Sequence, residues 1–213
     1  MKMYPKNREL HKGLALGGVI GPVIYFFLME TLGRLWPGYS SIRNHMSELG
    51  GVESPYKGIM NIFGFMLVGL FILIFGVGYN NHFKKSWHKT LTVLSLVVGG
   101  LFMIVVGFFP CDPACVDVTL VGRLHSLTSI PQSIALPLAA IFGAGVFSQE
   151  PKWGQKWAAL SFGLGMASMA AGPLMQIPAL HIFVGLIQRL GMGFALAWIF
   201  VVSIKMLIET RAL

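Results

Sequence analysis

The stretch TLTVLSLVVGGLFMIVVGFFP, Thr90–Pro110, contains no charged residue. A helix of about 20 apolar residues spans the hydrocarbon core of a bilayer, and this stretch is long enough to do so. The rest of the chain has a similar composition. Hydrophobic residues make up 55% of the 213 positions and charged residues only 11%, whereas charged residues make up about 25% of soluble domains. The mean hydropathy is +0.71, and we therefore expect a membrane protein.

Six apolar runs of this length occur, and the connections between them are too short for a soluble domain. We expect an all-α, polytopic bundle of six transmembrane helices that forms one domain, residues 1–213. The first run is longer than the apolar region of a signal peptide, and no small-residue cleavage site follows it, so we expect it to be retained. The predicted spans are residues 13–36, 57–79, 90–110, 123–147, 157–177 and 184–207.

The basic residues predict the orientation of the bundle. With the N-terminus inside, eleven lysines and arginines fall on the cytoplasmic side and five on the outer side. This bias follows the positive-inside rule and predicts an N-in, C-in protein of the cell membrane. It also explains the net charge of +8, so we expect no nucleic-acid partner. The inner set is Lys2, Lys6, Arg8, Lys12, Lys84, Lys85, Lys89, Lys152, Lys156, Lys205 and Arg211, and the outer set is Arg34, Arg43, Lys57, Arg123 and Arg189.

The first outer connection, PGYSSIRNHMSELGGVESP (residues 37–55), is expected to contain a short helix at the membrane interface. Ser40 or Ser41 would begin this helix and Gly50 would end it. One face would carry Ile42, Met46 and Leu49. Glu48 would lie in the last turn, where the helix dipole disfavours an anion, so we expect it to pair with an arginine of a neighbouring segment.

Polar and ionisable residues lie mostly toward the predicted outer ends of the spans, which favours a pocket open to the outside. Arg189 is about five residues inside the sixth span and needs a partner there. Glu30, Glu48 and Asp112 are the candidate acids. One interpretation is a structural ion pair, and the other is that Arg189 also faces an anionic ligand.

Asp112 and His125 flank the loop after the third span. They could form an acid/base pair or share a divalent metal at the outer cavity, or they could be a solvated aspartate and an interfacial histidine. No H-E-x-x-H, G-x-S-x-G or P-loop motif is present. Cys111 and Cys115 lie on the predicted outer side, which favours a disulfide over a shared soft metal.

Three motifs carry a resemblance to a known family: SSIRNHMSELG (residues 40–50), GFFPCD (residues 107–112) with a histidine thirteen residues after its aspartate, and GLIQRLGMG (residues 185–193). Together they resemble the prokaryotic membrane family known as domain of unknown function 998. The resemblance implies six helices and no settled activity. The positions that look characteristic of the family are Ser47, Glu48, Gly50, Pro110, Asp112, His125 and Arg189.

Three hypotheses follow from these patterns. The first is a hydrolase-like, membrane-embedded enzyme that acts on a lipid head group or small amphiphile. The second is a protein that binds or transports such a ligand without chemistry, and the third is a structural bundle. Under the first, Asp112, His125 and Ser47 would be catalytic, Asp112 and His125 would hold any metal, and the binding residues would be Glu48, Asn61, Gln188 and Arg189.

Overall fold

A computed structural model describes residues 5–211, and this part of the chain is helical with no strands. Six helices are long and apolar enough to cross a membrane, so the predicted all-α class with six spans is confirmed. Lys2, which was counted with the inner charges, lies outside the described residues. The bounds are Pro5–Leu35 (α1), Trp87–Val106 (α4), Leu120–Gln149 (α5), Gly154–Met175 (α6) and Val184–Arg211 (α7), and one further span consists of Lys57–Ile59 (α2), the π-helix Met60–Met66 (η2) and Leu67–His82 (α3).

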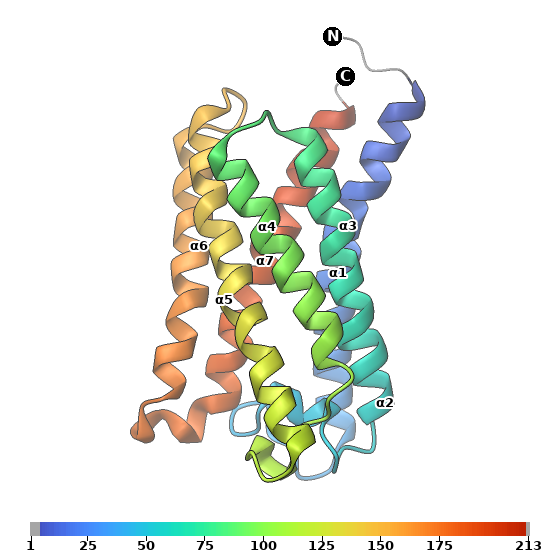
Figure 1. Cartoon of the computed structure of the whole chain (residues 1–213), viewed down its shortest axis with the longest axis vertical. Helices are drawn as coiled ribbons and strands as arrows, with labels where there is room; N and C mark the ends of the chain where they lie inside the picture. Colours follow the sequence, from blue (N-terminus) through green and yellow to red (C-terminus); the bar gives the residue numbers. More distant parts are fainter. Residues whose placement is uncertain (1–4, 212–213) are drawn as a thin grey trace.

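The six spans form a ring in chain order. Each packs against the next, from α1 to α3, α4, α5, α6 and α7, and α7 closes the ring by packing against α1. The start of α1 and the end of α7 lie at one end of the bundle, which is at the top of Figure 1 and is called here the termini end. The other end, called the disulfide end, carries residues 36–56, 107–119 and 176–183. That the termini end is cytoplasmic stays a prediction.

Aromatic side chains fill the ring toward the termini end. Tyr79, Phe83, Phe147, Trp153 and Trp198 are all buried and contact one another, with ring centroids 4.4 to 6.5 Å apart. Such rings bury much apolar surface and leave few voids. This half of the bundle is therefore mostly packed core, and the larger space inside the ring is found in the other half.

The outside of the bundle is apolar. Phe27 on α1, Leu127 on α5 and Ile208 on α7 are each more than 60% exposed. A soluble monomer rarely exposes apolar surface on every side, whereas a bilayer solvates it. The length and hydropathy of the helices agree with this, and the chain is a multi-pass membrane protein.

Two local expectations are revised by the structure. The third span ends at Val106, because Gly107 begins a set of tight turns that lead into Pro110. The first loop folds as a turn followed by the short 3₁₀ helix Met46–Gly50 (η1), which does not begin at Ser40. Met46 and Leu49 are buried, but Ile42 is half exposed, so these three do not form one apolar face. Whether this loop lies at a membrane interface stays a prediction.

Candidate functional site

A cavity of about 820 Å³ occupies the disulfide half of the ring. Its walls come mainly from α5, α6 and α7, and Met46 and Ser47 of η1 line its part at the disulfide end, which is called here the mouth. α5 and α7 face each other there without the close packing that each makes with α6, which leaves the space open.

The lining changes from polar to apolar with depth. Polar groups gather at the disulfide end, where the first loop, the start of α5 and the start of α7 meet: His45, Ser47, His125, Ser126, Gln176, His181 and Gln188. Ser129, Gln132 and Ser168 continue partway inward, and Leu136, Pro137, Met192 and Ala195 line the deeper part. No Asp, Glu, Lys or Arg is among the described residues that line the cavity.

Arg189 holds the first loop against α7 and does not line this cavity. One terminal nitrogen donates hydrogen bonds to the carbonyls of Ser41 (2.6 Å), Gly185 (3.0 Å) and Asn44 (3.3 Å). The other donates to the hydroxyl of Tyr39 (2.5 Å), whose ring lies 5.5 Å from the guanidinium carbon. Burial raises the pKa of Tyr39 against the opposing effect of Arg189, so the phenol stays protonated and accepts this bond. The expected carboxylate partner is therefore replaced by backbone carbonyls of the first loop.

Gln188 and Glu48 fix the backbone of the same loop. The side-chain oxygen of Gln188 accepts from the Met46 amide (2.7 Å), and its nitrogen donates to the Ser47 hydroxyl (3.4 Å). Glu48 accepts from the His45 amide (2.6 Å) and from the side-chain amide of Asn44 (2.8 Å). Glu48 thus closes the first turn of η1, where its negative charge is favourable. The expected pairing of Glu48 with an arginine is not found among residues 5–211.

Asn61 joins this loop to the second span. Its side-chain amide donates to the carbonyl of Gly50 (3.0 Å), and a side chain at Gly50 would collide with the Asn61 amide. Asn61 lies in η2, where the π-helical turn changes the direction of the side chains. Its role in the structure is to hold the end of η1.

Asp112 holds Thr119, whose hydroxyl caps the start of α5 by accepting from the Gly122 amide. One carboxylate oxygen accepts from the amides of Thr119 (2.7 Å) and Val118 (2.9 Å), and the other accepts from the Thr119 hydroxyl (2.8 Å). These bonds, led by that from the Thr119 amide, lower the pKa of Asp112. A side chain at Gly122 would overlap the carboxylate, so glycine is needed for this approach. Asp112 makes no hydrogen bond to His125 and belongs to no group of metal-ligating side chains among the described residues, so the expected pair of Asp112 and His125 is not found.

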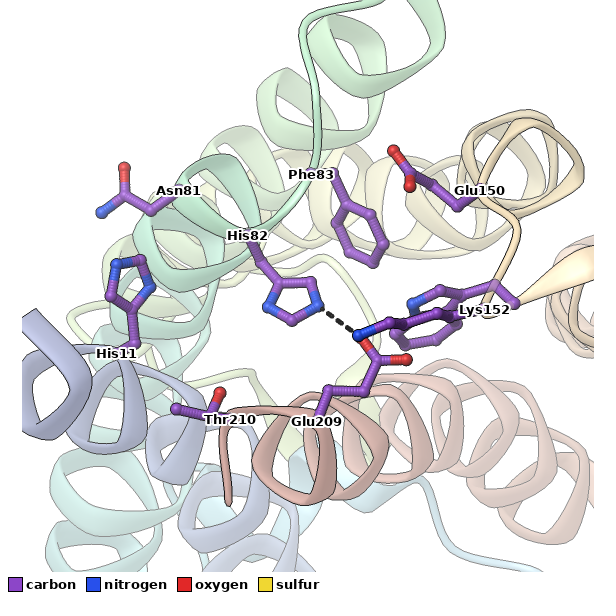
Figure 2. Close-up of a pocket in the computed structure, with 9 residues that line it drawn as sticks. His11, Asn81, His82, Phe83, Glu150, Lys152, Glu209 and Thr210 are labelled. Carbon is purple, nitrogen blue, oxygen red and sulfur yellow. Dashed lines mark hydrogen bonds and ion pairs between the residues drawn. The ribbon is translucent and has the colours of Figure 1, made fainter. Parts of the chain in front are cut away.

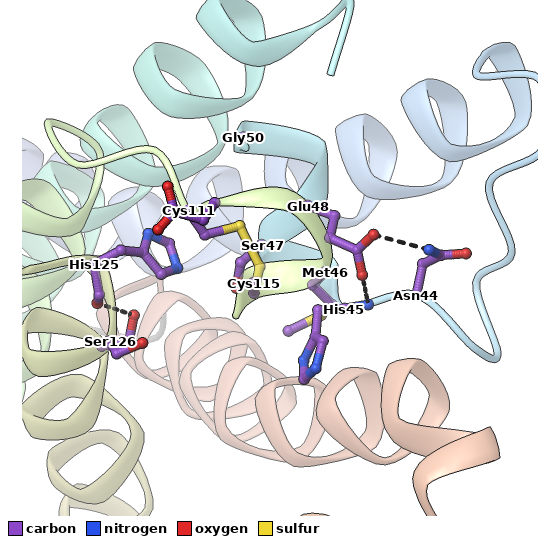
Figure 3. The surroundings of a disulfide bond; sticks show 12 residues. Asn44, His45, Met46, Ser47, Glu48, Gly50, Cys111, Cys115, His125 and Ser126 are labelled. Carbon is purple, nitrogen blue, oxygen red and sulfur yellow. Dashed lines mark hydrogen bonds between the residues drawn. A yellow bond between two sulfur atoms is a disulfide. The ribbon is translucent and has the colours of Figure 1, made fainter. Parts of the chain in front are cut away.

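His125 is buried beside the disulfide that links Cys111 and Cys115. Its Nδ1 lies 2.6 Å from the carbonyl oxygen of Phe109. Since a carbonyl only accepts, Nδ1 carries the proton and Nε2 keeps its lone pair. The ring points toward the disulfide in Figure 3. Ser126, next in sequence, donates to Asp117 (2.6 Å) and not to His125.

Comparison with known families places the sequence in one family. A family model described as protein of unknown function (DUF998) matches residues 19–205, which is nearly the whole chain. The chain belongs to this family. No curated protein and no solved structure matches it. The loop contacts and the cavity are therefore features of a DUF998 protein, and the family itself assigns no reaction to them.

The residues proposed from the sequence of this DUF998 protein fall into two groups. Ser47, His125 and Gln188 line the cavity, and Cys115 of the disulfide also reaches its wall. The remaining four lie behind the wall and hold the loops in place: Glu48, Asn61, Asp112 and Arg189. The strongly ionisable residues thus build the cavity mouth, and neutral polar residues face its interior.

Sequence reasoning gave no role to several lining residues. His45 and His181 lie at the mouth, and burial lowers the pKa of His45 against the opposing charge of Glu48. Gln132 is buried on α5, and its side-chain oxygen has no hydrogen-bond partner among the described residues. A glutamine among apolar residues of a span was the available signal for that position.

A second, smaller pocket of about 270 Å³ lies at the termini end. Figure 2 shows His82 of α3 and Glu209 of α7 facing each other there, with Nε2 and Oε2 3.0 Å apart. Lys205 lies 3.3 Å from the other Glu209 oxygen and over the rings of Trp153 and Trp157. The contact between His82 and Glu209 joins helices that are far apart in sequence, so spacing alone gave no sign of it, whereas Lys205 and Glu209 are four residues apart on α7.

Proposed function

We propose that this protein binds a membrane amphiphile, with the polar head of the ligand at the mouth of the cavity and its apolar part between α5, α6 and α7. The observation that carries the proposal is the polar-to-apolar gradient of a cavity of about 820 Å³. Ligand sites of about 300–1,000 Å³ are typical, with mostly apolar walls and a few placed polar groups. The cavity has this size and this composition.

The charge of the residues that line the cavity limits which polar head groups can bind there. Neutral hydrogen-bonding groups line the mouth, and both terminal nitrogens of Arg189, the residue after Gln188, are hydrogen-bonded to carbonyls and to Tyr39. A phosphate or carboxylate would find no arginine or lysine in the lining to pair with. Hydroxyl or carbonyl groups suit glutamine, serine and neutral histidine better. We therefore infer an uncharged polar head, such as a glyceride, a sugar or an ester.

Gln132 supports a ligand that reaches beyond the mouth. Gln132 lines the cavity, and its side-chain oxygen is buried in the wall with no hydrogen-bond partner among the described residues. A buried acceptor without a partner costs about 1–3 kcal/mol. A hydroxyl of the ligand would satisfy it once the side-chain amide turns toward the cavity.

A hydrolase-like activity is the second candidate, and one observation favours it. The bond from His125 to the Phe109 carbonyl leaves Nε2 with a free lone pair, and His125 lines the cavity. Such a base could activate water beside an ester. The set of Asp112, His125 and Ser47 expected from the sequence does not form a triad, because Asp112 holds Thr119. Under this proposal His125→Gln abolishes hydrolysis of an ester amphiphile and leaves its binding in place.

Binding is tested by filling the cavity. Ala195 is 1% exposed and lines the deep part, so Ala195→Phe places a ring where the ligand would lie. Ala167→Phe adds the same ring on the exposed face of α6 and is the matched control. A ring that takes about 1.4 kcal/mol from the binding free energy of the ligand lowers its affinity about tenfold.

The assay is native mass spectrometry of the full chain released from membranes, with identification of the co-purifying lipids. We expect a bound neutral amphiphile in the wild type and in Ala167→Phe. In Ala195→Phe the occupancy of this amphiphile should be roughly tenfold lower. Equal occupancy in both variants, at unchanged thermal stability, would mean that the lipid binds outside the cavity.

A further inference from the structure

The geometry points to a metal site that forms when the disulfide is reduced: Cys111, Cys115 and His125 then bind a single thiolate-seeking ion, Zn²⁺ or Cu⁺. The two sulfur atoms and a ring nitrogen of His125 all lie within 4.8 Å of one another. This is the only such group of three metal-ligating side chains among the described residues. The inference is independent of amphiphile binding.

His125 is oriented as a metal ligand. Histidines that bind metals commonly donate the other ring N–H to a carbonyl, which fixes the tautomer and the direction of the lone pair. His125 makes this bond through Nδ1 to the Phe109 carbonyl at 2.6 Å. Nε2 is therefore the atom available to an ion, on a side chain that is only 4% exposed.

The two cysteines are held for joint binding by their loop. Ala114 and Cys115 both adopt left-handed backbone conformations, with φ of 53° and 52°. This tight turn brings the Cα atoms of Cys111 and Cys115 to 4.9 Å apart. Gly51 packs so closely on Cys111 that an added Cβ would lie 3.1 Å from its sulfur. Figure 3 shows the two sulfur atoms beside the ring of His125.

The ligand set selects the kind of ion. Two thiolates and an imidazole suit soft or borderline ions such as Cu⁺ and Zn²⁺, and not Mg²⁺ or Ca²⁺. Asp112, the carboxylate expected from the sequence as a ligand, is outside the group because its oxygens bind Thr119 and Val118. Three protein ligands leave one position of a tetrahedral ion open, as in catalytic zinc sites. Cys115 and His125 both line the cavity, so the proposed site adjoins it.

Formation of the site requires two electrons. A phosphine reductant supplies them in vitro: it is oxidised to the phosphine oxide with oxygen from water, and each sulfur takes one proton. The two thiols then lose these protons as the ion binds, since thiolates are the ligands. Oxidised protein has no free thiolate and cannot hold the ion in this way.

The test uses the full chain in detergent, reduced with a phosphine under anaerobic conditions and freed of excess reductant. Co²⁺ serves as the probe for Zn²⁺ because bonds from thiolate to cobalt give a charge-transfer absorption. Cu⁺ is titrated separately against a chromogenic chelator. We expect one ion per reduced chain in at least one of the two titrations, displacement of Co²⁺ by Zn²⁺ if it is the divalent ion, and none in the oxidised chain.

Variants locate the ion. Mutation of a residue that only hydrogen-bonds to a metal ligand weakens metal affinity by about 10–100-fold. Cys115→Ser and His125→Gln each remove a ligand itself, so each should lower the affinity by at least about tenfold. His181→Gln removes a histidine of the same cavity that lies outside the group, and it should bind like the wild type. Unchanged binding in both ligand variants would overturn the inference.

A further measurement needs no variant. On the reduced wild type, a bound ion should slow the alkylation of Cys111 and Cys115 by a maleimide at least about tenfold, and a chelator should restore the rate. A reduced chain that binds neither ion, with both cysteines alkylated at the same rate with and without metal, contradicts the site.

Discussion

Replacement of Arg189 by methionine should release the first loop from α7. Arg189→Met keeps most of the length of the side chain but removes every donor to the carbonyls of Ser41 and Asn44 and to the Tyr39 hydroxyl. Each hydrogen bond to a charged group contributes about 1.5–3 kcal/mol. Because Arg189 is half-buried and water replaces part of what is lost, we expect a total of about 2–4 kcal/mol.

Arg189→Lys distinguishes the effect of the positive charge of Arg189 from the effect of the planar geometry of its guanidinium. A lysine ammonium keeps the positive charge but cannot reach carbonyls and the phenol at once in the planar geometry of a guanidinium. We expect a loss of about half that of the methionine variant. If Arg189 bound an anionic ligand mainly through its charge, lysine would substitute well.

The assay is thermal and denaturant unfolding in detergent, combined with hydrogen exchange of residues 39–50. Exchange in this loop should accelerate in Arg189→Met because the loop loses its anchor. Arg34→Met is the control, since Arg34 has an 81% exposed side chain and a 3.5 Å contact to Glu30. It should change stability by no more than about 0.5 kcal/mol. Unchanged loop exchange in Arg189→Met would refute the reasoning.

Three further predictions concern the packing of the bundle. The pKa of Asp112 is below its ordinary value of 3.8, so Asp112 contributes fully to stability above pH 3.8. This contribution is lost as the pH falls through the lower pKa of the folded state. Asp112→Asn should therefore flatten the dependence of the melting temperature on pH in this acid range. Gly122→Ala should destabilise the protein by about 1–3 kcal/mol because its Cβ meets the Asp112 carboxylate, whereas Gly163→Ala, with nothing within 4 Å, should not, as measured by unfolding of both. Trp198→Phe removes the 2.6 Å hydrogen bond from the indole N–H to the Ser161 hydroxyl and should lower the free energy of unfolding by about 1–3 kcal/mol. Trp87 is exposed, so Trp87→Phe is the control, and an equal loss of stability in both variants would contradict a stabilising bond between Trp198 and Ser161.

The sequence was sufficient for the fold because the signals are local. Each span is a continuous apolar run, and a run of about 20 residues has few alternatives to crossing the bilayer. The position of polar residues toward one end of the spans also pointed to a shared polar region there. Cys111 and Cys115 are only four residues apart, so their pairing needed no knowledge of the fold.

The sequence did not show which polar residues line the cavity and which hold the loops in place. Arg189 binds carbonyls of Ser41 and Asn44, and every residue has a carbonyl, so no side-chain pattern marks those partners. Asp112 accepts a hydrogen bond from the Thr119 amide because the loop after the disulfide brings Thr119 next to the Asp112 carboxylate. The charged residues were therefore expected in the cavity, whereas the structure uses them to shape its mouth.

The most direct test of the central claim is an experimental map of the protein in lipid nanodiscs, inspected in the cavity between α5, α6 and α7. The account predicts elongated density with a polar end near His45 and Ser47, an apolar end near Ala195, and a hydrogen bond to Gln132. A cavity closed by α5 packing directly on α7, or one that holds only water, would contradict it.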